Sequence, residues 1–107
     1  MISDEDAEKA VDYLRDSASQ TAQARADRIH AEEYRKSMLA IIMSHQPEGP
    51  ANKQEKAAYS SNEYVAHLTK IREAVFQDEL LRARREAALA KINAWQTFQA
   101  TMRAARI

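Results

Sequence analysis

The 107-residue sequence predicts an all-α protein, a long antiparallel two-helix hairpin that is coiled-coil-like and has a short helical cap at its turn. The only glycine and both prolines fall between Gln46 and Asn52, so the chain has few other places to turn. Hydrophobic residues make up 45% and charged residues 30%, and such a mixture with helical spacing is typical of long helices. We therefore expect a single α-hairpin domain over residues 1–107. Its helices should cover about 4–44 and 62–106, around a connector with a short helix over about 46–60.

The first predicted helix begins at Ser3, a good N-cap, and Asp6 stands three residues later in the place of a capping-box acid. No residue breaks the helix before about Ser44. Its apolar residues are spaced three or four apart: Ala7, Val11, Leu14, Ala18, Ala22, Ala26 and Ile29. Beyond Ile29 this stripe drifts around the helix, so the apolar pattern is not a strict heptad.

Asn52 and Glu55 have the spacing of a capping box, which predicts a short helix over 53–59. Ser61 can then cap the second long helix. The main apolar stripe of that helix comprises Leu68, Ile71, Val75, Leu80, Ala83, Ala87, Ala90, Ala94, Phe98 and Met102.

Two helices joined by a short connection usually pack antiparallel. Matching the two apolar stripes pairs residue i with about residue 109 − i, which sets Ala18 opposite Ala90 and Ile41 opposite Leu68. The fold-back midpoint then falls near residues 54–55. The same pairing lays the acidic start of the chain beside its basic end, which would explain the uneven charge within one chain.

A second apolar stripe flanks the alanine-rich one on the second helix. It comprises Leu81, Ala88, Ile92 and Trp95. A face this wide needs a further partner, and a second copy, giving a homodimeric four-helix bundle, is the simplest. Two alternatives stay open: Trp95 and Leu81 could fold under the terminal residues of their own chain, or a different protein could cover them.

Four cations near the end of the chain are candidates for nucleic-acid contact: Arg82, Arg84, Arg85 and Lys91. Clustered cations are enough to contact phosphates, but the aromatic residues that mark single-strand binders are missing around them. Pairing with the acidic first turns is the alternative interpretation.

The sequence favours no enzyme, cofactor or metal site. There is no cysteine and only one glycine, so a thiolate site and a phosphate-binding glycine loop are excluded. His45, His67 and Glu63 fall near the turn but lack the i, i+4 histidine pair of a helical zinc site. No apolar run is long enough for a membrane span, and the acidic start is unlike a signal peptide, so we expect a cytoplasmic protein without membrane contact.

The second half runs from Ser60-Ser61-Asn62-Glu63-Tyr64 through Leu80-Leu81-Arg82-Ala83-Arg84-Arg85-Glu86 to Ala94-Trp95-Gln96-Thr97-Phe98. It resembles a group of small phage and prophage proteins in which a Ser-to-Tyr connector precedes an Arg-rich helix ending in an Ala-Trp-Arg-like motif, with Gln96 here where Arg is commoner. The resemblance implies an accessory role beside phage recombination or replication and supplies no catalytic residues. We therefore expect a non-enzymatic interaction, adaptor or structural protein that forms homodimers. The alternative is a nucleic-acid-binding accessory factor.

Overall fold

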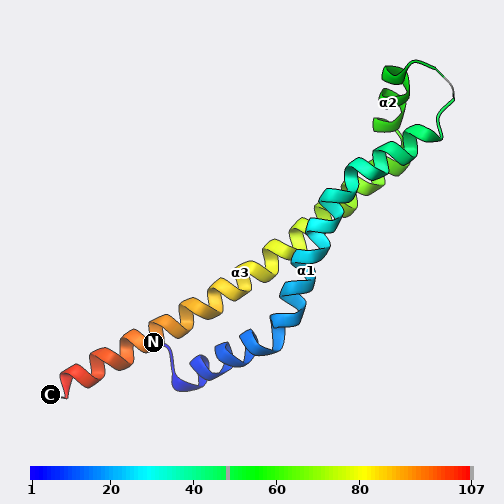
Figure 1. Ribbon diagram of the computed structural model, residues 1–107. Helices are drawn as coiled ribbons and strands as arrows, with labels where there is room; N and C mark the ends of the chain where they lie inside the picture. Colours follow the sequence, from blue (N-terminus) through cyan, green and yellow to red (C-terminus); the bar gives the residue numbers. More distant parts are fainter. Residues whose placement is uncertain (48, 107) are drawn as a thin grey trace. The chain divides into compact units, whose positions relative to one another are not determined.

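The computed structural model describes residues 1–47 and 49–106. Within these ranges the chain forms three α-helices and no strand: α1 (Asp4–Ser44), α2 (Ala51–Tyr59) and α3 (Asn62–Ala105) (Figure 1). The predicted all-α hairpin with a short helix at its turn is confirmed. Part of the predicted connector, Glu48, lies outside the described residues.

Local side-chain contacts explain where the helices begin. Ser3 and Asp6 bond reciprocally, with Asp6 N donating to Ser3 Oγ at 3.0 Å and Ser3 N donating to Asp6 Oδ2 at 3.1 Å, so the predicted capping box is confirmed. Tyr64 N donates to Ser61 Oγ at 3.2 Å, as expected for a cap of α3. Helix α2 begins at Ala51, two residues before the predicted start, because Pro50 has a φ of −57° and its carbonyl accepts the first helical bonds.

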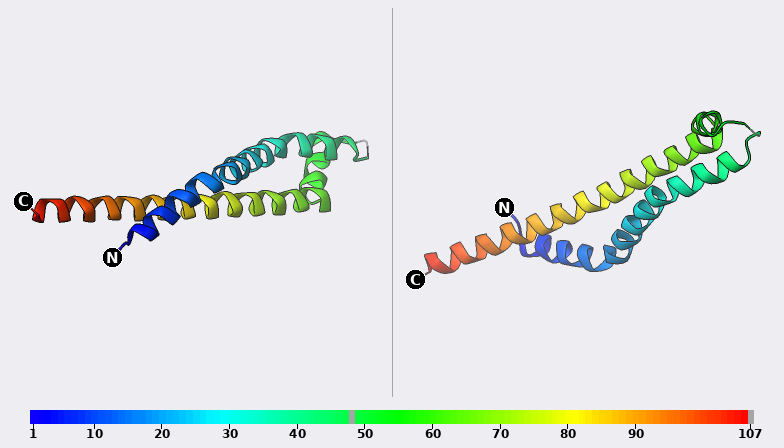
Figure 2. Two further views of the ribbon diagram at one scale, coloured as in Figure 1. Left: turned by 90° about the horizontal axis from the view of Figure 1, so that it is seen from below. Right: turned by 45° about the horizontal axis from the view of Figure 1, so that its top comes forward.

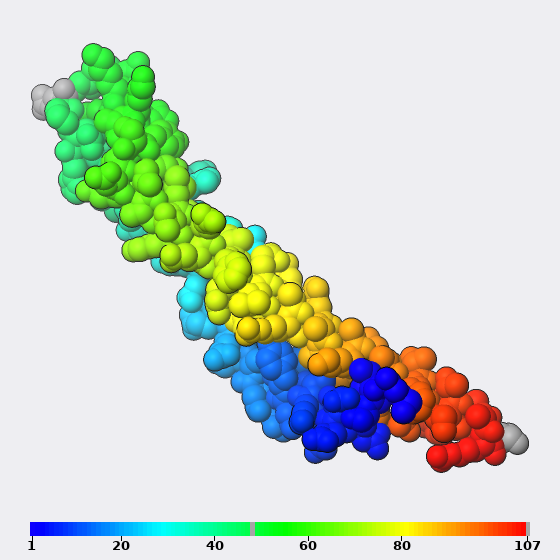
Figure 3. Space-filling model, turned by 180° about the vertical axis from the view of Figure 1, so that it is seen from behind, coloured from blue at the N-terminus to red at the C-terminus, as the bar shows by residue number. Residues whose placement is uncertain are grey.

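The chain divides into two compact units. Unit 1 joins Met1–Ala22 to the part of α3 from Glu79 onward, and unit 2 is Gln23–Asp78. In unit 1 the start of α1 packs against the second half of α3 (Figure 3). In unit 2, α2 connects the end of α1 to the start of α3 (Figure 2), and the core there is formed by Ile42, Ala58 and Tyr64.

The buried positions follow a regular spacing along each helix. In α1, buried or half-buried residues recur three and four apart at positions 7, 10, 14, 17, 21, 24, 28 and 31. In α3 they recur at positions 64, 67, 71, 74, 78 and 81, and again at 88, 92, 95 and 99. This is a seven-residue repeat over residues 7–31 of α1, but beyond it the buried and half-buried positions move to 34, 38 and 42, so the expected drift from a strict heptad is observed there. Apolar residues alone hid the repeat because polar side chains such as Ser17, His67 and Asp78 occupy buried positions.

The predicted register is wrong. Asp4 was expected near residue 105, but its carboxylate accepts a hydrogen bond from Trp95 Nε1 at 2.8 Å, ten positions earlier. Ala31 was expected opposite residue 78, but its carbonyl lies 3.0 Å from His67 Nε2. The seam side chains expected at Val11, Ile29, Ile41 and Leu68 are exposed. The mismatch arises because the predicted pairing matched apolar residues only, whereas the observed seam includes polar ones.

Candidate functional site

The stripe predicted to contact a second copy is largely covered within one chain. Leu81 is 5% exposed and Ala88 6%, whereas Ile92 and Trp95 are half-buried. Trp95 is tied to the start of α1 by its hydrogen bond to Asp4. These positions match the alternative in which Leu81 and Trp95 fold under their own chain. Little of Leu81 and Ala88 is left for another molecule to contact, so a self-association surface has to be sought elsewhere.

The four cations predicted to contact nucleic acid do not form one patch. Arg84 and Lys91 are seven residues apart on the same flank of α3, and both line a hollow in unit 1. Arg82 lies about 160° around the helix from Arg84, since each residue turns the helix by about 100°. Its guanidinium lies 3.8 Å from the carboxylate of Glu79. Arg85 is exposed and does not line the hollow.

Apart from Glu8, the acids of the first turns contact partners on α1 itself or polar partners on α3. Lys9 Nζ lies 3.1 Å from Glu5 Oε1, and Arg15 bridges Asp12 at 3.3 Å and Asp16 at 3.0 Å. Within the described residues, no ion pair involves Arg84, Arg85 or Lys91. Ion pairing between the two ends of the chain therefore does not neutralise these three cations.

The hollow of unit 1 lies between the first turns of α1 and the middle of α3. It encloses about 360 Å³ and is lined by Asp6, Lys9, Ala10, Tyr13, Arg84, Ala87, Ala88 and Lys91. The pKa of Asp6 is lowered from its ordinary value of 3.8, mainly because Ser3 donates hydrogen bonds to the carboxylate. The nearby charges of Lys9 and Lys91 lower it further by a smaller amount. This region therefore combines three cations and one carboxylate with an apolar floor of alanines.

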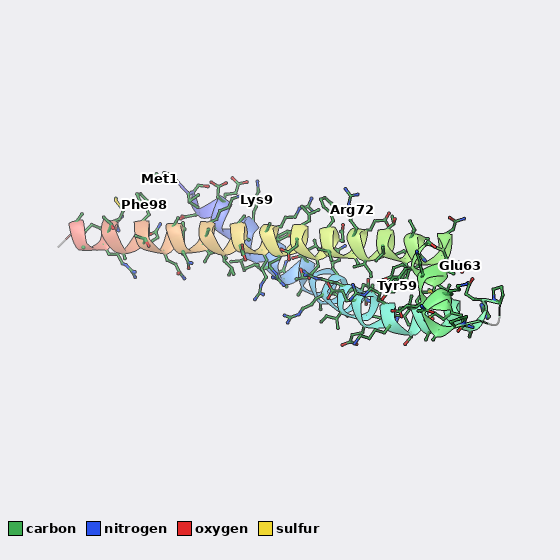
Figure 4. All side chains as sticks on the ribbon, turned by 90° about the horizontal axis from the view of Figure 1, so that it is seen from above. Met1, Lys9, Tyr59, Glu63, Arg72 and Phe98 are labelled. Carbon is green, nitrogen blue, oxygen red and sulfur yellow. The ribbon has the colours of Figure 1, made fainter. Side chains whose placement is uncertain are left out.

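A second surface feature lies on α3 in unit 2. Val65, Leu68 and Phe76 are large apolar side chains that are exposed, and Phe76 is 66% exposed. Figure 4 shows Arg72, which lies between them in the sequence, on the side of α3 turned away from α1 of this unit. A shallow hollow of about 430 Å³ adjoins this strip and is lined by Thr69, Arg72, Glu73, Phe76 and Gln77. We call the set Val65, Leu68, Arg72 and Phe76 the outward face.

Unit 2 also contains a polar cluster that sequence reasoning missed. Asp78 is buried and accepts a hydrogen bond from Arg28 Nη1 at 3.2 Å, while Arg28 Nε donates to Glu32 at 3.1 Å. His67 is buried and meets the ring of Tyr34 edge-on, with 5.8 Å between the ring centroids. A charged or histidine side chain within an otherwise apolar repeat is the one sequence signal that could have revealed this cluster.

At the cap, Tyr59 and Tyr64 pack edge to face with 5.1 Å between their ring centroids, while His45 is exposed. In the described part of the chain, no three His, Cys, Asp or Glu side chains are grouped so that they could hold a metal ion. None of the helices described is both long enough and apolar enough to span a bilayer.

Comparisons with known proteins add no relative. No family model matches the chain, and neither a curated protein nor a solved structure matches it.

Proposed function

We propose that this chain is a non-enzymatic interaction protein that self-associates through the outward face of α3. The observation that carries this proposal is the exposure of Phe76 beside a hollow on the same helix. Exposed aromatic and aliphatic side chains that share one face of a helix are typical of an interaction surface.

Helix geometry separates this face from the seam within the chain. Taking 3.6 residues per turn, Val65, Arg72 and Phe76 point within about 40° of one another. The buried residues Tyr64 and Asp78 lie roughly 120° away from them. Contacts on the outward face therefore need not disturb the seam, and the seven-residue repeat of the seam supports coiled-coil packing of the hairpin.

A second copy is the occupant we propose for this face. A two-fold contact requires a surface that is complementary to itself, because the same patch is used by both molecules. The outward face offers a projecting ring at Phe76 and, directly beside it, the hollow lined by Thr69 and Gln77. In a two-fold dimer, Phe76 of each copy would enter the hollow of the other and bury its ring.

Sedimentation equilibrium of the whole chain across micromolar concentrations tests this function. We expect the mass of a dimer for the native chain and of a monomer for Phe76→Glu, with unchanged helicity by circular dichroism. The matched control is Leu89→Glu, since Leu89 is 40% exposed on the same helix but belongs to unit 1. A native monomer, or a Phe76→Glu variant that still sediments as a dimer, would contradict the proposal.

A nucleic-acid-binding accessory factor is the second candidate. One observation favours it: within the described residues, no ion pair involves Arg84, Arg85 or Lys91. Another disfavours it, because these cations lie on more than one flank of α3. Binding to duplex DNA that weakens steeply with salt, and weakens further in an Arg84→Gln/Lys91→Gln variant, would support it. We expect no such binding at low salt while the dimer persists.

The resemblance to small phage and prophage proteins suggests the setting in which such a dimer would act. We propose a cytoplasmic adaptor or structural role beside phage recombination or replication, with the dimer as the unit that contacts other proteins. Dimer formation is measurable without identifying any of them.

A further inference from the structure

The hollow of unit 1 takes no part in the self-association proposed above, and two of its cations, Arg84 and Lys91, have no ion-pair partner among the described residues. Each helix contributes four residues at positions i, i+3, i+4 and i+7, so each presents a single face. Because α1 and α3 run antiparallel here, the small residues Ala10, Ala87 and Ala88 fall in the middle, with longer side chains around them. Small side chains at the centre leave the space of about 360 Å³. Pockets for small molecules begin at about this size.

The cations around this space differ in how much of their charge is compensated. Lys9 is bonded to Glu5 at 3.1 Å, and Lys91 lies close enough to Asp6 to lower its pKa. Arg84, at the other end beside Tyr13, has no ion-pair partner among the residues described. A negatively charged group entering the hollow would therefore meet Arg84 and a partly compensated Lys91.

We propose that this hollow binds a small amphipathic anion, with its phosphate or carboxylate head at Arg84 and its apolar body over the alanines toward Lys91. A guanidinium can hold such a head with two parallel hydrogen bonds. The alanine floor and Tyr13 suit an aromatic or aliphatic body.

The spacing of the cations favours a small anion over a chain of phosphates. Arg84 and Lys91 are one heptad apart, about 10 Å along the helix. Arg82 lies on the other flank and Arg85 does not line the hollow, so the positive surface does not continue from this site along α3.

The test is a titration of the full chain with phenyl phosphate, followed by the backbone amide resonances in heteronuclear NMR. We expect saturable shifts at Ala87, Ala88 and Lys91. Arg84→Gln should weaken binding by about tenfold or more, the usual effect of losing a charged hydrogen bond. The matched control, Arg85→Gln, removes a neighbouring charge outside the hollow and should change the affinity by less than about twofold.

Further probes identify which part of the ligand matters. Phenylacetate in place of phenyl phosphate distinguishes a carboxylate site from a phosphate site, and saturable binding of either supports the proposal. Inorganic phosphate and phenol, which supply the head and the body alone, should each bind at least tenfold more weakly than the better amphipathic probe. Ala87→Leu fills the hollow from an exposed position and should abolish binding while leaving helicity unchanged.

Three results would overturn the proposal. The first is the absence of saturable shifts with both amphipathic probes. The second is a loss of affinity in Arg85→Gln equal to that in Arg84→Gln, which would indicate general attraction of anions to α3. The third is displacement of phenyl phosphate by duplex DNA, which would assign these cations to nucleic acid. The dimer mass is measured separately, so failure of this site leaves the self-association proposal intact, and the reverse also holds.

Discussion

Replacing Tyr13 by phenylalanine should make the protein more stable. The hydroxyl of Tyr13 is buried and has no hydrogen-bond partner within the described part of the chain. A tyrosine hydroxyl transferred from water into the protein loses its hydrogen bonds to solvent, and leaving such a group unpaired costs about 1–3 kcal/mol. Phenylalanine keeps the ring and removes only the unpaired group.

The expected gain is less than this full cost, because the lost oxygen also gives up its packing contacts. We expect the free energy of unfolding to rise by about 1 kcal/mol, or the melting temperature by roughly 4 °C. Urea denaturation followed by circular dichroism measures the change. Fluorescence of Trp95, the only tryptophan, measures the unfolding of unit 1, in which Tyr13 also lies.

Tyr59→Phe is the matched control for this substitution. Tyr59 is exposed, so its hydroxyl already has access to water, and the same change should alter stability by less than about 0.5 kcal/mol. If Tyr13→Phe instead lowers the free energy of unfolding by 1 kcal/mol or more, its hydroxyl has a partner and the reasoning is refuted.

Further predictions concern the capping box and the buried ion pair. Ser3→Ala should lower stability by about 1 kcal/mol in a denaturant titration, because it removes the cap of α1; an unchanged midpoint would contradict this. The folded-state pKa of Asp6 is lowered, so its ionised form contributes stability above the ordinary value of 3.8. That contribution should disappear as the pH falls through the folded pKa, and a stability difference between the native chain and Asp6→Asn that persists unchanged at pH 2 would refute it. Asp78→Ala should cost about 2 kcal/mol because Arg28 loses a buried partner, whereas the double replacement Arg28→Met/Asp78→Leu should cost less in urea melts. A double variant that is less stable than Asp78→Ala would contradict this interpretation.

Local signals in the sequence were sufficient for the two long helices, whereas the capping box expected at Asn52 and Glu55 did not form, since Pro50 stands at the N-cap of α2 without a side-chain cap hydrogen bond. The only glycine and both prolines lie at one turn, and Ser3 and Ser61 each bond the amides that caps are expected to bond. These features act over three or four residues, so a single sequence contains everything needed to predict them.

The pairing of the helices depended on information that apolar residues do not carry. Ala10, Ser17 and Ala24 are buried, whereas larger apolar residues such as Val11 and Ile29 are exposed. Small and polar residues allow two helices to approach closely, but hydrophobic matching gives them little weight. The register was therefore set by the wrong stripe, and the alanine-rich stripe of α3 was taken for the seam.

The wrong register also misplaced the candidate sites. Once Leu81 and Ala88 are placed in the seam, the flank that carries Arg84 and Lys91 borders the hollow of unit 1. Phe76 was missing from both predicted stripes, and its exposure beside a hollow depends on which face of α3 is used within the chain. Neither feature could be located before the seam was known.

A single cysteine at position 72 gives the most direct test of self-association through the outward face. The native chain has no cysteine, and residue 72 lies between Thr69 and Phe76 on that face, so a two-fold contact brings its two copies together. We predict that Arg72→Cys forms a disulfide-linked dimer rapidly under mild oxidation, because the two Cα atoms can come within about 7 Å of each other. Leu89→Cys, exposed on the same helix in unit 1, should link slowly. Equal linking rates for the two variants, or faster linking of Leu89→Cys, would contradict self-association through this face.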